Sequence, residues 1–215
     1  MVMSVRYRMA MGSDKQAGVT PDPARRARRR PDDRLGADDW AMAALTVIGA
    51  RGVDQVTVEG LARDLDVTKG SFYWHFADRS ALIAAALDLW ERTATVSIIE
   101  RLDGIADPID RLHALFEASF ADTERGPLDA ALVVSLDDPL VGPTVRRVAE
   151  QRVSFLADLF RETGMTPAKA RGRARQAYST YVGHFHVRRA LPGDRDLEGP
   201  SRAYLRQLVA TLISP

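Results

Sequence analysis

The residues best suited to contact another molecule lie in one stretch of this sequence, VTKGSFYWHFADRSAL at positions 67–82. Positions 72–76 are five consecutive rings (Phe, Tyr, Trp, His, Phe), although Phe, Trp and Tyr make up only 7% of the chain. Lys69 and Arg79 lie on either side of the rings. Exposed rings can contact bases and the two cations can bind phosphate, whereas buried rings serve packing. The stretch is therefore a candidate nucleic-acid contact whose rings must first be divided into buried and exposed.

Catalytic and metal-binding chemistry has little support in the residue types. The 215 residues include no cysteine, which excludes disulfides, thiol catalysis and cysteine-ligated metals. His184 and His186 resemble a metal-binding pair, but residues two apart on a helix lie about 200° apart and face different sides. Neither a glycine-rich phosphate loop nor a nucleophile elbow occurs in the sequence. We therefore predict no metal, no cofactor and no enzymatic activity.

Helical spacing divides the rings of positions 72–76. At about 100° per residue, Phe72 and Phe76 share one face and should hold the helix to a core. The opposite face and the flanks carry the remaining residues: Gly70, Ser71, Tyr73, Trp74 and His75. A glycine inside a helix costs about 1 kcal/mol relative to alanine, and close approach of DNA would give Gly70 a purpose. We expect Trp74 to project toward a partner.

The residues before the rings complete a helix-turn-helix. Thr57 can cap a helix whose apolar residues follow helical spacing: Val58, Leu61, Ala62 and Leu65. Asp66 and Val67 interrupt this pattern, and Thr68 can cap the short helix that carries the rings. Two helices separated by about three residues cannot lie antiparallel, and such a turn is typical of a helix-turn-helix. Spacing alone leaves a second interpretation open, in which the short helix only packs between two longer ones.

The rest of the chain has helical patterns and no alternating strand pattern. Asp38 can cap a first helix that Gly52 ends, and Asp78 can cap a fourth that runs to about residue 101. Later segments are expected at 108–120, 128–136, 139–163, 167–190 and 200–213. Gly126-Pro127 should separate the first two of these, and Pro143 should lie in or near the first turn of the third. The sequence predicts an all-α protein with about nine helices.

Composition favours a globular chain, and its charge is unevenly distributed. Hydrophobic residues make up 46% and charged residues 27%. No run reaches the roughly 18 apolar residues of a membrane helix, and no signal peptide is recognisable, so a cytoplasmic protein without a membrane partner is expected. Residues 1–34 hold nine Lys/Arg against four Asp/Glu, whereas residues 35–90 hold four against eight.

Residues 1–36 are predicted to form a disordered basic arm because they lack apolar periodicity. Its arginine cluster comprises Arg25, Arg26, Arg28, Arg29 and Arg30. DNA affinity rests largely on phosphate neutralisation, so the acidic balance of residues 35–90 is unfavourable for DNA binding. We hypothesise that the arm supplies the missing positive charge and reaches a minor groove; the alternative is a solvated tail.

Residues from about Trp40 to Leu89 resemble the DNA-binding domain of TetR-type (tetracycline-repressor-like) transcriptional regulators. The family pattern places a Thr at the start of the second helix, here Thr57, and an Ala before the turn, here Ala62. It continues with residues matched here by Val67, Thr68, Gly70, Ser71, Phe72, Tyr73, His75, Phe76, Arg79 and Leu82. So long an ordered string at fixed spacing favours DNA binding over the packing-only interpretation.

The resemblance implies a homodimeric repressor of all-α subunits that binds a palindromic double-stranded DNA operator and is released by a small-molecule inducer. Each subunit would have a helix-turn-helix domain at 37–82 and a ligand-binding and dimerisation domain at 83–215. The implied phosphate contacts are Thr57, Tyr73, His75 and Arg79. The implied groove-facing residues are Thr68, Lys69, Gly70, Ser71 and Trp74.

Two positions depart from the family pattern. The turn position usually held by Gly is Asp66, which tolerates the left-handed conformation better than most residues but adds negative charge near the DNA side. The usual Lys is Arg79, which keeps the charge and adds a fork that suits phosphate.

The resemblance also implies an inducer pocket among the middle helices. The candidate lining residues are Trp90, His113, Phe116, Phe120, Phe155, Tyr178 and Tyr181. Each can instead be an ordinary core residue, but aromatics with a few polar tips would as a group suit a largely apolar ligand. The last two helices, at about 167–190 and 200–213, would form the dimer seam, where Gly183 permits close approach.

A second class of function stays open. The acidic helix-turn-helix region is also compatible with a helical protein that binds a small molecule or a protein partner and has weak or no DNA binding.

Overall fold

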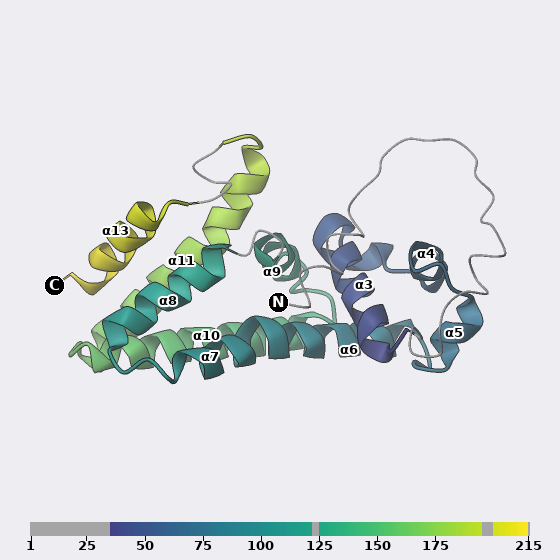
Figure 1. Ribbon diagram of the computed structural model, residues 1–215, viewed down its shortest axis with the longest axis horizontal. Helices are drawn as coiled ribbons and strands as arrows, with labels where there is room; N and C mark the ends of the chain where they lie inside the picture. The colour runs from purple at the N-terminus through teal and green to yellow at the C-terminus, as the bar shows by residue number, and fades with distance from the viewer. Residues whose placement is uncertain (1–34, 122–124, 195–199, 215) are drawn as a thin grey trace. The chain divides into compact units, whose positions relative to one another are not determined.

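The computed structural model describes residues 35–121, 125–194 and 200–214, so the arginine cluster of the predicted arm lies outside the described residues. Within these ranges every regular element is helical (Figure 1). Three of the elements follow one another without a break, and counting them as one helix gives nine α-helices in the described ranges. The all-α prediction is confirmed.

The N-terminal helices are α3 (Ala37–Arg51), α4 (Val58–Asp64) and α5 (Lys69–Tyr73), with a 3-10 turn, η2 (Val53–Gln55), between the first two. They are followed by α6 (Arg79–Glu91). α4, the turn and α5 occupy the positions expected for a helix-turn-helix.

Two of the predicted caps are present at the ends of these helices. The Thr57 hydroxyl accepts a hydrogen bond from the Gly60 amide at 3.1 Å, and Asp78 Oδ1 accepts one from the Ala81 amide at 2.8 Å. The prediction that Asp38 caps α3 was wrong. The helix begins at Ala37, and Asp39 Oδ2 reaches back to accept a hydrogen bond from the Gly36 amide at 2.9 Å.

α6, the π-helical segment η3 (Arg92–Val96) and α7 (Ser97–Leu102) form one continuous run. Its end at Leu102 agrees with the end expected near residue 101. The π-helical turn was not predicted. Such turns change the direction of backbone carbonyls and are frequent at functional sites.

The C-terminal helices are α8 (Pro108–Ala121), α9 (Arg125–Val133), α10 (Gly142–Glu162), α11 (Pro167–Ala190) and α13 (Arg202–Ile213). The prediction that Gly126-Pro127 separates two helices was wrong. Both residues lie in the first turn of α9, where a proline needs no amide hydrogen. α10 begins at Gly142 rather than at Pro139, and Pro143 lies in its first turn as expected.

Two clusters of buried side chains hold the helices together. The first joins the helix-turn-helix and α6 to α9 and α10, and includes Trp40, Phe72, Leu82, Leu132 and Val145. The second lies between α8, α10, α11 and α13. Because the first cluster contains residues of α9 and α10 and α3 packs against α9, the helix-turn-helix is joined to the C-terminal helices through α3. None of the helices in the described ranges is long and apolar enough to span a membrane.

Candidate functional site

The turn between α4 and α5 is made by Asp66, which has a positive φ of 53°. Its amide donates to the Arg63 carbonyl at 3.1 Å, and the next amide, of Val67, donates to the Ala62 carbonyl at 2.9 Å. These bonds close the end of α4 and direct the chain into α5. The prediction that Asp66 takes the left-handed conformation usually given to glycine is confirmed.

The rings of Phe72 and Phe76 face the core, as helical spacing predicted. Phe72 is 0% exposed and packs edge-on against Trp40 with the ring centroids 5.4 Å apart. Phe76 is also buried, and its ring centroid lies 5.5 Å from that of Phe72. A helix of only five residues has little stability of its own, so these contacts fix its position.

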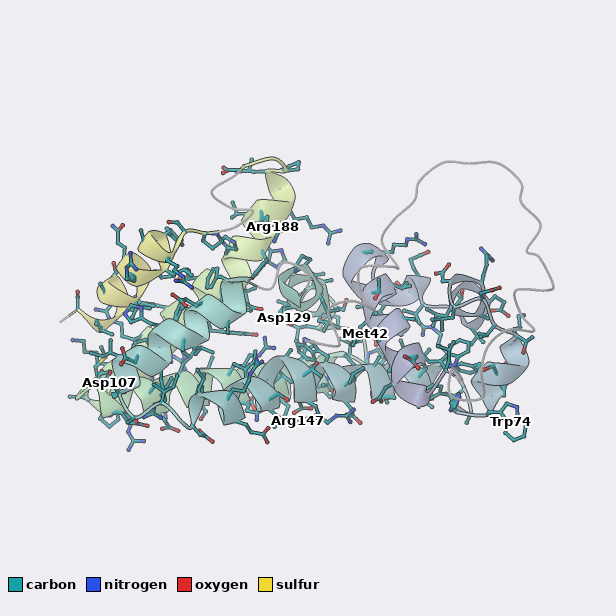
Figure 2. All side chains as sticks on the ribbon, viewed as in Figure 1. Met42, Trp74, Asp107, Asp129, Arg147 and Arg188 are labelled. Atoms are coloured by element: carbon teal, nitrogen blue, oxygen red, sulfur yellow. The ribbon has the colours of Figure 1, made fainter. Side chains whose placement is uncertain are left out.

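The opposite side of α5 is open to solvent. Trp74 is 88% exposed and Tyr73 is 63% exposed. Figure 2 shows Trp74 projecting away from the helices beside it. Thr68, Lys69, Gly70 and His75 are exposed and Ser71 is half-buried. The residues predicted to face a groove therefore form one accessible surface, which we call the α5 surface.

No packing contact requires a glycine at position 70. A Cβ there would meet only Thr68 Oγ1, at 3.6 Å, which is an ordinary contact distance. Packing within the described residues therefore does not explain this glycine. Close approach of another molecule to the α5 backbone would supply a reason for it.

A surface hollow beside α5 brings together three of the four predicted phosphate contacts, Thr57, Tyr73 and Arg79. His75, the fourth, is exposed but does not line this hollow. The hollow also has acidic walls, formed by Asp54, Glu59 and Asp78. Its electrostatics are therefore mixed rather than strongly positive.

Two cations of this region are already engaged within the subunit. Arg79 donates from Nε to the Val56 carbonyl at 2.7 Å and from Nη2 to the Val53 carbonyl at 2.6 Å. Lys69 donates to the carboxylate of Glu59, and this hydrogen bond lowers the pKa of Glu59. Sequence reasoning missed both interactions, because the partners lie 10 to 26 positions apart.

A cavity lies between η3, α7, α8, α10 and α11. Five predicted residues line it, namely Phe116, Phe120, Phe155, Tyr178 and Tyr181. Two do not: Trp90 is buried outside the walls, and His113 is half-buried on α8. The free volume is about 80 Å³, which is small beside the roughly 300–1,000 Å³ of common ligand pockets.

A buried ion pair that sequence reasoning missed includes Arg152, which lines this cavity. Arg152 Nη1 donates to Asp129 Oδ2 at 2.6 Å, and Arg152 also donates to Thr95 Oγ1 at 2.9 Å and to the Ala94 carbonyl at 3.1 Å. Asp129, labelled in Figure 2, is 2% exposed. It also accepts hydrogen bonds from Trp90 and, at 2.8 Å, from the Tyr181 hydroxyl.

The charges of this network are fixed by their surroundings. Burial, the largest single influence, would lower the pKa of Arg152, but Asp129 together with Tyr181 and Tyr178 outweighs it, and the pKa is raised above its ordinary value. Burial, helped by the charge of Asp129, raises the pKa of Tyr181, and burial likewise raises that of Tyr178. Arg152 thus keeps its charge and both phenols are neutral at physiological pH. An Asp inside the apolar sequence LDAALVV, residues 128–134, was the one signal that could have indicated it.

The described residues contain no group of three or more His, Cys, Asp or Glu placed to hold a metal ion. His184 is buried against Phe120, with the ring centroids 4.9 Å apart, and His186 is half-buried.

Comparison with known proteins agrees with this arrangement. Residues 42–86 match the family model of bacterial regulatory proteins of the tetR family. The HTH-type transcriptional repressor KstR2 of Mycobacterium tuberculosis is 28% identical over 116 residues, which are 54% of this chain and 54% of that protein. The chain thus matches about half the length of this curated relative.

Solved structures share the fold over most of the chain. A TetR transcriptional regulator from Legionella pneumophila has a TM-score of 0.71 at 14% identity, covering 85% of this chain and 100% of that one. A TetR-family regulator from Agrobacterium tumefaciens has a TM-score of 0.69 at 23% identity, covering 85% and 98%.

The structure thus combines an exposed helix-turn-helix with a larger helical region, the all-helical architecture that the solved structures share. Residues 42–86 therefore carry the match to the tetR family, and the relatives and solved structures found are transcriptional regulators. The three proteins named above are transcriptional regulators, in agreement with the prediction of no enzymatic activity.

Proposed function

We propose that the chain is a sequence-specific DNA-binding transcriptional repressor that acts as a homodimer and is released from a palindromic operator by a small, largely apolar inducer. The observation that carries this proposal is the division of α5, with Phe72 0% exposed on one side and Trp74 88% exposed on the other. The buried ring fixes the helix to the core. Burial of the exposed tryptophan ring against a partner would remove apolar surface from water and so favour binding.

DNA is the partner that best fits the chemistry of the α5 surface. Hydroxyl, ammonium and ring groups lie on one side of a short helix, beside a hollow that holds Thr57, Tyr73 and Arg79. Such groups can contact base edges from the helix and phosphates from its margins. The surface has few free cations, so we assign the missing phosphate attraction to the arm, residues 1–34, which holds nine Lys/Arg against four Asp/Glu.

The proposed dimer seam is formed by α11 and α13. Val187 and Leu191, on and just after α11, are 45% and 53% exposed, and Tyr204 on α13 is 47% exposed. A Cβ at Gly183 would meet no atom within 4 Å, so a partner helix has room to approach. Two subunits related by a two-fold axis would present two α5 surfaces, which suits a palindromic operator.

The proposed inducer site is the cavity, and α9 links it to the DNA-binding helices. Arg152 and Tyr181 of the cavity wall bond to Asp129 on α9. The next residue toward the N-terminus, Leu128, lies so close to α3 that a Cβ at Gly49 would be 3.5 Å from its Cα. A ligand that favours a different position of α9 would shift α3 and the helices packed on it, and so lower DNA affinity.

Electrophoretic mobility shift with the DNA upstream of the protein's own gene tests the proposal. Wild type should retard this DNA in the presence of excess unrelated DNA, and Trp74→Ala and Lys69→Ala should weaken binding about 5- to 100-fold with unchanged circular dichroism. Val134→Ala is the control, because Val134 is 70% exposed but lies at the end of α9. Equal binding by wild type and Trp74→Ala would favour the alternative, a helical binding protein without specific DNA recognition.

A further inference from the structure

We infer that the cavity takes an uncharged, largely apolar molecule that carries one hydrogen-bond acceptor oxygen, and that Tyr178 donates to this oxygen. The inference rests on the proposed function, because it names the class of inducer that the cavity admits. It is carried by the walls, by the pairing of Arg152 and by the different partners of the two tyrosines.

The walls are mainly hydrocarbon. Ten of the fifteen lining residues are Ile, Leu, Phe or Ala from η3, α7, α8, α10 and α11. Arg152 is the one lining residue with a charged side chain. Hydrophobic burial is therefore the main source of affinity, and any ionic group on the ligand would have to be accommodated at Arg152.

Arg152 has little capacity left for an anion. Its guanidinium already donates to Asp129, Thr95 and Ala94, at 2.6, 2.9 and 3.1 Å. The ion pair with Asp129 carries no net charge. A ligand carboxylate would lose its hydration and lie beside Asp129, and a ligand ammonium would lie beside Arg152. Both charged classes are therefore disfavoured relative to a neutral molecule of the same shape.

The two tyrosines differ in what they can offer a ligand. The Tyr181 hydroxyl donates its proton to Asp129 Oδ2 at 2.8 Å, so that proton is used within the protein. The Tyr178 side chain lines the cavity near Arg152, a group that can only donate, so Arg152 cannot take the Tyr178 proton and that proton can be given to a ligand. Both tyrosines line the cavity. Tyr178 is thus the donor that selects an acceptor oxygen.

Because the cavity is small, a ligand can enter it only if the surrounding helices move. About 80 Å³ of free space is less than the roughly 150 Å³ cavity that holds benzene in another protein, so a ring-sized ligand must push the walls apart. The walls include η3, where Ala94 and Thr95 contact Arg152, and α11, where Tyr181 contacts Asp129 of α9. Entry of a ligand therefore acts on the elements that pack against the DNA-binding helices.

Isothermal titration calorimetry of the full chain with four molecules of similar shape tests the inference. The set is acetophenone (neutral, with an acceptor oxygen), ethylbenzene (neutral, without one), benzoate and 1-phenylethylamine. Acetophenone should bind about 3- to 10-fold more tightly than ethylbenzene, the difference that one hydrogen bond makes, and at least about 10-fold more tightly than either ion.

Two variants that each remove one hydroxyl separate the hydrogen bond from general effects. Tyr178→Phe should reduce the preference for acetophenone over ethylbenzene to about 1 while leaving ethylbenzene binding intact. Ser154→Ala removes an exposed hydroxyl of α10 that does not line the cavity and should leave the preference unchanged. Tighter binding of benzoate, an undiminished preference in Tyr178→Phe, or no binding of any of the four at millimolar concentration would overturn the inference. The mobility shift without ligand tests DNA binding independently of these titrations. A failure of this inference is therefore distinguishable from a failure of the proposed function.

Discussion

Lys69 donates a hydrogen bond to Glu59, and this ion pair joins the solvent-facing sides of α5 and α4. Both side chains are more than half exposed, at 56% and 57%, so the pair lies on the surface that we propose contacts DNA. The charge of Lys69, one of the proposed groove contacts, is therefore partly neutralised in the absence of DNA. Binding of a phosphate or base by Lys69 must compete with Glu59.

Glu59→Gln should therefore strengthen DNA binding. The change releases Lys69 and removes a negative charge from the hollow beside α5, so affinity at about 100 mM salt should rise about 2- to 5-fold. Fluorescence anisotropy with labelled upstream DNA measures the effect. Glu100→Gln makes the same charge change at an exposed position of α7 and should change the DNA affinity little. An unchanged affinity in Glu59→Gln would show that Lys69 does not contact DNA.

Arg79 has a stabilising role besides the predicted phosphate contact. Its two hydrogen bonds to the carbonyls of Val53 and Val56 tie the start of α6 to the segment before α4. Arg79→Met should lower the free energy of unfolding by about 1–3 kcal/mol, because it leaves these carbonyls without their charged donor. Urea denaturation measures the loss, and exposed Arg63→Met should change the midpoint little. Equal stability of the two variants would refute this role.

The pair of Asp129 and Arg152 should be among the most sensitive positions of the C-terminal helices. Asp129→Ala leaves a buried guanidinium without its counter-ion and should cost about 3–5 kcal/mol of unfolding free energy. Asp158→Ala removes a carboxylate from an exposed pair with Arg161 and should cost less than about 1 kcal/mol. The double variant Asp129→Ala/Arg152→Met should lose less than the two single variants together. Additive losses would mean that the two charges do not depend on each other.

Deletion of residues 1–34 tests the proposed role of the basic arm. Each phosphate contact that is lost lowers the slope of log affinity against log salt by about 0.9. The truncated chain should therefore bind upstream DNA more weakly at low salt and with a slope reduced by about 2 or more. A slope equal to that of the full chain would show that the arm makes no phosphate contacts, as expected of the alternative, a solvated tail.

Local features could be predicted from the sequence because they depend on residues a few positions apart. The caps at Thr57 and Asp78, the left-handed turn at Asp66 and the buried side of α5 all follow from short-range spacing. The start of α9 did not, because Gly126 and Pro127 are typical of loops as well as of a first helical turn. A Cβ at Gly126 would overlap the ring of Phe185, so tertiary packing explains this glycine.

The electrostatic partners could not be predicted because they join distant segments. Glu59 and Lys69 are 10 positions apart, Arg79 and Val53 are 26 apart, and Arg152 and Ala94 are 58 apart. Periodicity places a residue on a face of its own helix but says nothing about which helix packs there. For the same reason, sequence reasoning named five aromatic residues of the cavity and missed the ion pair that includes Arg152.

Selection of binding sites from a random duplex DNA pool tests the central claim most directly. The claim is that the α5 surface, with Trp74 at its centre, recognises DNA sequence. The purified full-length chain should enrich duplexes that share a two-fold symmetric motif, and Trp74→Ala, folded to the same extent, should enrich no such motif. A pool that stays random with the wild-type chain, or that converges on the same motif with Trp74→Ala, would contradict the account.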